Sequence, residues 1–128
     1  MNRHATTLTA PSRAANSALW ALQILVALFF LAAGAGKLAG SPEMVAAFER
    51  IGFGQWFRYA TGLIEAAAAI LLLVPRLVPF GALLLAATMG GAIAAHLFVF
   101  RDSPLVPIVL LALNLVIVYG RRGQLIGR

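Results

Sequence analysis

Long apolar runs separated by short polar connections dominate this chain of 128 residues. The first run, residues 18–35, contains a single hydrophilic side chain, Gln23. A helix of this length would extend about 27 Å, close to the thickness of a bilayer core. Lipid offers no water to backbone polar groups, so only helices and closed barrels can cross it. The runs therefore predict membrane-spanning helices.

The composition excludes several classes of protein. The chain is 62% hydrophobic and 11% charged, whereas soluble domains carry about 45–50% apolar and about 25% charged residues. The net charge of +6 is spread singly between apolar segments, which argues against a nucleic-acid partner and for a lipid bilayer. The chain has no cysteine and two histidines, so we expect no metal site, and redox chemistry would belong to a bound cofactor or a partner subunit.

The order of the segments predicts an all-α protein, an integral membrane four-helix bundle. We expect spans at about 18–36, 58–74, 79–100 and 105–119, which together form a unit over 18–120. Basic cytoplasmic tails would occupy 1–17 and 121–128. Between the first two spans, Ser41-Pro42-Glu43 has the residue order of a helix start. It predicts a short amphipathic helix over about 42–51 on the membrane surface.

Charge on the connections predicts the orientation. If the N-terminus is cytoplasmic, that side carries six basic residues and no acid: Arg3, Arg13, Arg76, Arg121, Arg122 and Arg128. The other side carries four basic residues, Lys37, Arg50, Arg58 and Arg101, offset by Glu43, Glu49 and Asp102. The positive-inside rule favours both termini in the cytoplasm. An alternative reads the first run as a signal peptide cleaved near Ala33-Gly34-Ala35, but the run is longer than the usual signal core.

Glu65 is the most informative polar residue, because it lies in the middle of a predicted span. A carboxylate there costs roughly 2.5–3.5 kcal/mol on insertion scales and normally faces protein or water. In the predicted orientation, Lys37 and His96 approach the same outer half of the bundle. We expect these three residues to line a cavity for ligand binding or proton handling, rimmed by Arg58 and Arg101. Other polar side chains are expected to form hydrogen bonds between helices: Gln23, Thr61, Thr88 and Asn114.

A structural interpretation competes with this one. Glu65 would then be neutralised by Lys37 or His96, and the pair would lock the helices without binding a ligand. The sequence is compatible with an ionised or a neutral Glu65.

Several of these residues also carry a family likeness. The chain resembles the DoxX and DoxX-like membrane proteins over about residues 20–120, in the Gly-x-x-Lys that ends at Lys37, the Gly-x-x-Glu that ends at Glu65, the Pro-Arg-Leu turn and the late His96. The resemblance implies a multi-pass protein of the bacterial inner membrane. Its named relatives include a small subunit of thiosulfate:quinone oxidoreductase and a membrane component of an oxidative-stress complex.

Three functions remain open at this point. The first is an accessory or quinone-interacting subunit of a membrane redox system, not catalytic alone, without a covalently bound cofactor and with an oxidoreductase as its partner. The second is a small-molecule or proton-coupled carrier. The third is a structural or partner-recruiting membrane protein without a ligand. A homo-oligomer is compatible with each.

Overall fold

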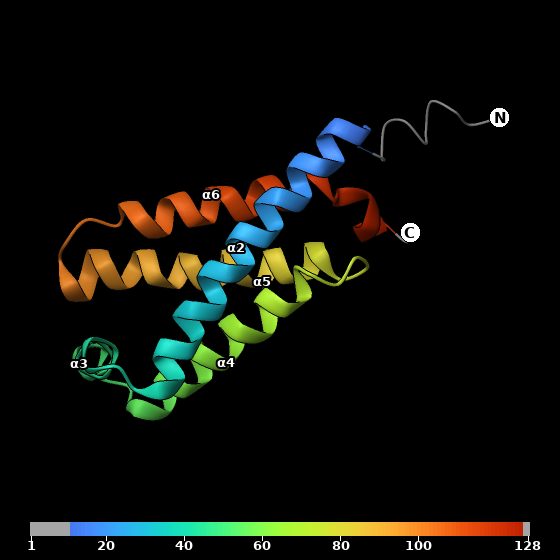
Figure 1. Cartoon of the computed structure of the whole chain (residues 1–128). Coiled ribbons are helices and arrows are strands. Elements are labelled where there is room, and N and C mark those ends of the chain that lie inside the picture. The colour runs from blue at the N-terminus through green and yellow to red at the C-terminus, as the bar shows by residue number, and fades with distance from the viewer. Residues whose placement is uncertain (1–10, 127–128) are drawn as a thin grey trace.

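The computed structural model describes residues 11–126, and the regular structure within that range is entirely helical (Figure 1). The all-α prediction is therefore confirmed for these residues. The expected tail at residues 1–10 and the last two residues lie outside the described part of the chain. In chain order the elements are α2 (Arg13–Ala39), α3 (Pro42–Ile51), α4 (Gln55–Leu71), α5 (Val78–Ala95), the π-helix η1 (His96–Phe100), α6 (Leu105–Gly120) and the 3-10 helix η2 (Arg122–Ile126).

The first helix is longer than the sequence indicated. It begins at Arg13, so residues 13–17 belong to a helix and not to a tail. The Oγ of Ser12 accepts a hydrogen bond from the Ala15 N–H and caps the helix start, which satisfies a backbone donor that would otherwise be exposed. The helix ends where Gly40 adopts a left-handed conformation with φ of 75° and donates to the Gly36 carbonyl, an ending typical of glycine.

The next two helices follow the predicted order with one shift. Helix α3 spans Pro42–Ile51, so the helix predicted over 42–51 is confirmed. Helix α4 begins and ends about one turn earlier than the expected 58–74. After α4 the chain runs through turns from Leu72 to Val78. The helix cannot continue because the proline at position 75 has no N–H for the helical hydrogen bond.

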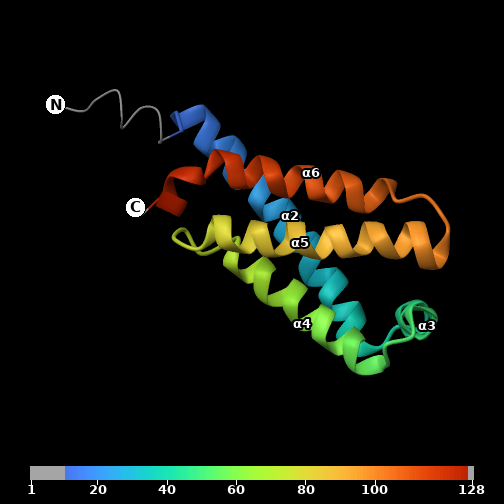
Figure 2. The ribbon, with the colours of Figure 1, turned by 180° about the vertical axis from the view of Figure 1, so that it is seen from behind.

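The helices pair along their lengths, and the pairs diverge toward one end. Helix α2 packs most closely on α4, and α5 packs on α6. Both ribbon views show α4 diverging from α5 toward the end that carries α3 (Figures 1 and 2). At the opposite end the α4–α5 hairpin is tight, since a Cβ added at Gly81 would lie 2.7 Å from the Ala68 carbonyl oxygen. The helices are therefore packed tightly at the end that holds the α4–α5 connection, called the closed end below, and diverge toward the end that carries α3.

A small apolar core fills the closed part of the bundle, while large apolar side chains cover its outside. Phe30, Leu72, Leu85 and Ile117 are fully buried. Leu25, Phe98 and Val106 are among the many large apolar side chains that are more than half exposed. Two helical segments, Arg13–Ala39 and Val78–Phe100, are long and apolar enough to cross a membrane, while α4 and α6 have 17 and 16 residues.

A buried polar cluster ties the closed end together and corrects the expectation that residues from 121 onward form a tail. Arg121 is buried, and its Nε donates to the Gln23 Oε1 at 2.8 Å while its Nη1 donates to the Asn16 Oδ1 at 2.7 Å. The Nε2 of Gln23 donates to the Leu72 carbonyl at 3.0 Å. These bonds join α2 to the ends of α4 and α6. Arg121 is held in the bundle because its Nε and Nη1 both find acceptors there.

Candidate functional site

A backbone contact between α2 and α4 builds one wall of the site. A Cβ added at Gly34 would lie 2.8 Å from the Gly62 carbonyl oxygen, and one added at Gly62 would lie 3.0 Å from the Lys37 Cβ. Only glycine allows two helices to approach this closely. The residue one turn beyond each glycine then lies at the contact, which places Lys37 of α2 beside Glu65 of α4.

Lys37 and Glu65 form a buried ion pair. The Lys37 Nζ lies 2.9 Å from the Glu65 Oε1, and the Glu65 side chain is 3% exposed. The structural interpretation left Lys37 or His96 open as the partner of Glu65, and the structure pairs Glu65 with Lys37. A buried pair of this kind is stable only while both charges are present, since removing one leaves the other uncompensated.

His96 lies on the other pair of helices and has its own carboxylate partner. It begins the π-helix η1, a wider turn that is frequent at functional sites. Its Nδ1 lies 2.5 Å from the Oδ1 of Asp102, which follows the end of η1. Asp102 was not predicted as a site residue. The only signal in the sequence was an acid six positions after the histidine, in a turn before Ser103-Pro104.

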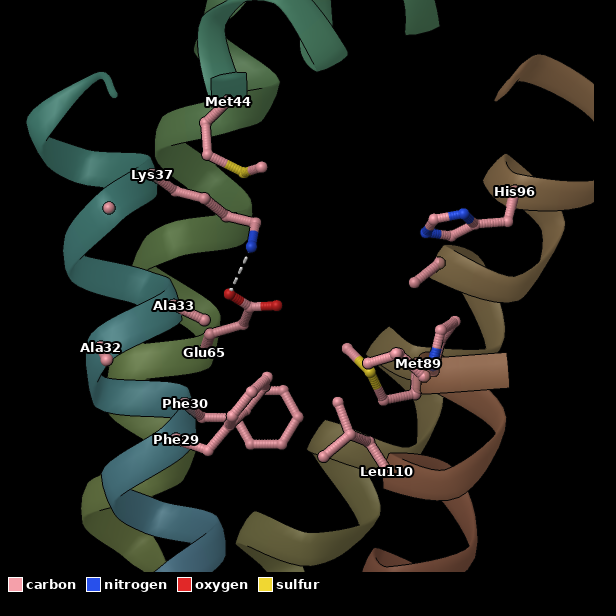
Figure 3. A pocket seen from close by; sticks show the side chains of 14 residues that line it. Phe29, Phe30, Ala32, Ala33, Lys37, Met44, Glu65, Met89, His96 and Leu110 are labelled. Carbon is pink, nitrogen blue, oxygen red and sulfur yellow. Dashed lines mark ion pairs between the residues drawn. The ribbon is translucent and has the colours of Figure 1, made fainter. Parts of the chain in front are cut away.

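The two groups face one cleft of about 340 Å³ between the pairs of helices. Figure 3 shows Lys37 and Glu65 on one side and the ring of His96 directed toward them from the other. The rest of the lining is apolar, including Phe29 and Phe30 of α2, Met89 of α5, Leu110 of α6 and Met44 of α3. The expected cavity lined by Lys37, Glu65 and His96 is thus present in the structure, with walls that sequence reasoning did not identify.

The two predicted rim residues lie elsewhere. Arg58 is 5% exposed and does not line the cleft. Its guanidinium donates to the Lys37 carbonyl and, at 2.6 Å, to the Gln55 Oε1, so it holds the end of α2 against α4. Arg101 is exposed, ends η1 with φ of 56°, and is also absent from the lining.

The four side chains expected to bond between helices behave differently from one another. Gln23 bonds across helices in the cluster at the closed end. Three others correct the expectation, because each donates to the carbonyl four residues earlier in its own helix: Thr61 to Phe57, Thr88 to Leu84 and Asn114 to Leu110. This bond within the helix competes with a bond to a neighbouring helix, because the carbonyl four residues earlier already lies within reach of the side chain.

The site carries a hydrogen-bonding end and an apolar body. Among residues 11–126, no three histidines or acids gather as they would around a metal ion. The arrangement suits a small molecule with a polar head and an apolar tail, since ligand pockets are largely apolar with a few convergent polar groups.

Comparison with known proteins agrees with the family likeness in the sequence. The chain matches the DoxX-like family over residues 21–118. It is 30% identical over 106 residues to a protein described as "Uncharacterized protein YdgD" from Bacillus subtilis strain 168, with 77% of this chain and 93% of that protein covered. No solved structure matches the chain closely enough to count as similar. The matched region contains Lys37, Glu65 and His96, and the chain belongs to the DoxX-like family.

Proposed function

We propose that this chain is a four-span membrane protein that binds a small neutral amphipathic molecule, with a quinone head group as the leading candidate. In this role it serves as an accessory subunit of a membrane redox system. The observation that carries the proposal is the buried Lys37–Glu65 ion pair at 2.9 Å, which faces an apolar cleft. A pair that served only to lock α2 and α4 would not need an open cleft beside it.

The membrane part of the proposal is supported by the outer surface. Large apolar side chains are exposed on all four long helices, for example Leu28, Leu63, Leu83 and Val109. An apolar surface of this extent is typical of contact with lipid. A 16-residue helix reaches about 24 Å, which suits a span near the thin end of the bilayer range.

The distribution of charge supports cytoplasmic termini in a bacterial inner membrane. Figure 1 shows the start of α2, the 3-10 helix η2 and the α4–α5 connection at one end of the bundle. Within residues 11–126 that end carries four arginines and no acid: Arg13, Arg76, Arg121 and Arg122. The opposite end carries Glu43, Glu49 and Asp102 among its basic residues. This asymmetry follows the positive-inside rule.

The orientation can be tested with single cysteines, because the natural chain has none. Ser103→Cys and Arg76→Cys place a thiol in an exposed turn at each end. In intact spheroplasts, a membrane-impermeant maleimide should label the Ser103→Cys variant. It should label the Arg76→Cys variant only after the spheroplasts are lysed. Labelling of Arg76→Cys in intact spheroplasts would reverse the orientation, and equal labelling of both would contradict a spanning bundle.

Ligand binding can be tested by filling the cleft. Ala33 lines the cleft, whereas Ala35 on the same helix is exposed and does not. Ala33→Phe should weaken binding of a short-chain benzoquinone by about ten-fold or more, equivalent to about 1.4 kcal/mol. Ala35→Phe should bind as the natural chain does. Binding is measured as ligand-induced stabilisation in detergent, which reaches about 2.7 kcal/mol at one hundred times the Kd.

The result separates the candidate functions. Stabilisation that Ala33→Phe abolishes and Ala35→Phe retains supports the cleft as the binding site. If the natural chain gains no stability from any amphipathic probe, the ligand-binding proposal fails. The result would then favour the structural interpretation, in which the ion pair locks the helices without binding a ligand.

The redox assignment requires a partner protein. The chain has no cysteine, so it cannot itself exchange disulfides or hold an iron–sulfur cluster through thiolates. A redox centre would be supplied by another subunit, and this chain would hold the lipid-soluble molecule near it.

A further inference from the structure

We propose that the cleft selects a neutral ligand whose head carries a hydroxyl group, as in a phenol or a hydroquinone, and that Asp102 is the positioning residue that prepares His96 to receive it. This inference rests on the proposed function and narrows it to a ligand class. It follows from which polar atoms the cleft presents.

The first side of the cleft presents an acceptor next to a donor. The Oε1 of Glu65 faces Lys37, whereas Figure 3 shows the second carboxylate oxygen pointing away from Lys37 into the cleft. Lys37 contacts this carboxylate through Oε1, at 2.9 Å. An ionised carboxylate can only accept, and the ammonium of Lys37 can only donate. A ligand group placed here must therefore donate to Glu65, accept from Lys37, or do both.

The second side presents another acceptor because of Asp102. The Asp102 carboxylate accepts from the Nδ1 of His96, so Nδ1 carries the proton. The proposal requires a neutral imidazole, which the ¹⁵N measurement described below tests, and in that form the other nitrogen, Nε2, is an acceptor. The ring is directed into the cleft (Figure 3), and His96 is part of its lining. Asp102 itself is outside the lining, so it acts through His96 alone.

A hydroxyl fits these groups better than a carbonyl does. A hydroxyl both donates and accepts, so it can satisfy a carboxylate oxygen or an imidazole nitrogen and also the ammonium. A carbonyl only accepts, so it could accept from Lys37 but could donate neither to the second oxygen of Glu65 nor to a neutral His96. Unpaired polar groups in a dry site weaken binding. The reduced, hydroxyl-bearing form of a ring should therefore bind more tightly than its oxidised form.

Charge and size narrow the ligand further. The opposite charges of Lys37 and Glu65 compensate each other, so the site offers no net charge to a phosphate or an ammonium head. The volume of about 340 Å³ lies near the small end of ligand pockets, which span about 300–1,000 Å³. A single ring with a short apolar chain is the class of molecule that fits.

The ligand class is tested with a pair of probes that differ in whether the ring oxygen carries a hydrogen or a methyl group. 4-Hexylphenol donates and accepts, whereas its methyl ether, 4-hexylanisole, only accepts. In detergent, with partition into empty micelles subtracted, the phenol should bind about ten-fold or more tightly than the ether. If both bind equally, the hydroxyl preference is wrong while the proposed function stands. If neither binds but the short-chain benzoquinone does, the hydroxyl preference is wrong alone, and if none of the three binds, the proposed function fails with it.

The role of Asp102 is tested by Asp102→Asn, with Glu49→Gln as the control. Glu49 is an exposed acid at the same end of the bundle, so both changes remove one negative charge. The chain has only two histidines, and His96→Gln assigns the ¹⁵N resonances of the ring. The natural chain and Glu49→Gln should show a protonated Nδ1 and an unprotonated Nε2. Asp102→Asn should lose that signature and most of the preference for the phenol. Retention of both would overturn the positioning role.

Discussion

Gly34→Leu is expected to separate α2 from α4 and to abolish the folded site. Even the first carbon of the new side chain would lie 2.8 Å from the Gly62 carbonyl oxygen and 3.1 Å from the Ala66 nitrogen. These are backbone atoms, so no side-chain rotation can relieve the clash. Overpacking typically costs about 1–3 kcal/mol, and a backbone clash in the most extensive helix contact should reach or exceed the upper value. Thermal unfolding in detergent measures the loss.

Gly90→Leu is the matched control for this change. A Cβ added at Gly90 meets no atom within 4 Å, and the residue lies on an exposed face inside α5. Glycine is roughly 0.8–1 kcal/mol less favourable than alanine inside a helix, and leucine ranks next to alanine, so this variant should be at least as stable as the natural chain. If Gly34→Leu and Gly90→Leu unfold at the same temperature, the close approach of α2 and α4 does not stabilise the fold.

Apolar periodicity and turn residues predicted the helices well because those signals are local. The start of α3 at Pro42 was readable from Ser41-Pro42-Glu43, and its end from Gly52. The start of α2 was missed because Ser12 and the alanines after it are polar or small and carry no apolar signal. The burial of Arg121 was missed because its acceptors, Gln23 and Asn16, lie about a hundred positions away in the sequence.

The candidate site was only partly predictable, because local signals reveal which residues are unusual but not which distant residues they contact. Glu65 and Lys37 stood out because a charge in an apolar segment needs a partner, whereas the close contact at Gly34 and Gly62 became visible only in the structure. Arg58 and Arg101 were placed at the rim from their position along the helix alone, which does not determine where a side chain points. The direction of the His96 ring and its bond to Asp102 depend on the π-helical turn η1. The hydrogen-bond pattern of a π-helix leaves no recognisable signal in the sequence.

Lys37→Met should destabilise the protein by about 3–5 kcal/mol, because it leaves the Glu65 carboxylate buried without a counter-charge. Methionine retains the length and much of the volume of lysine, so the loss measures charge and not packing. Arg76→Met is the control, since Arg76 is an exposed cation in the α4–α5 connection and its replacement should change stability by less than about 0.5 kcal/mol. Thermal unfolding in one detergent compares the three proteins. A Lys37→Met chain as stable as Arg76→Met would contradict a charged, buried pair.

The double variant Lys37→Met, Glu65→Leu then separates the two roles of the pair. Replacing both charges by apolar groups removes the uncompensated carboxylate, and such replacements are often neutral or stabilising by about 1–4 kcal/mol. The double variant should therefore regain the stability that Lys37→Met loses. It should not regain the preference for 4-hexylphenol over its ether, because the acceptor of Glu65 and the donor of Lys37 are both gone. A stable double variant that still discriminates the two probes would assign the discrimination to His96 and leave the ion pair as a helix lock. Stability without discrimination would mean that the chain keeps these charges in an apolar bundle to bind the ligand.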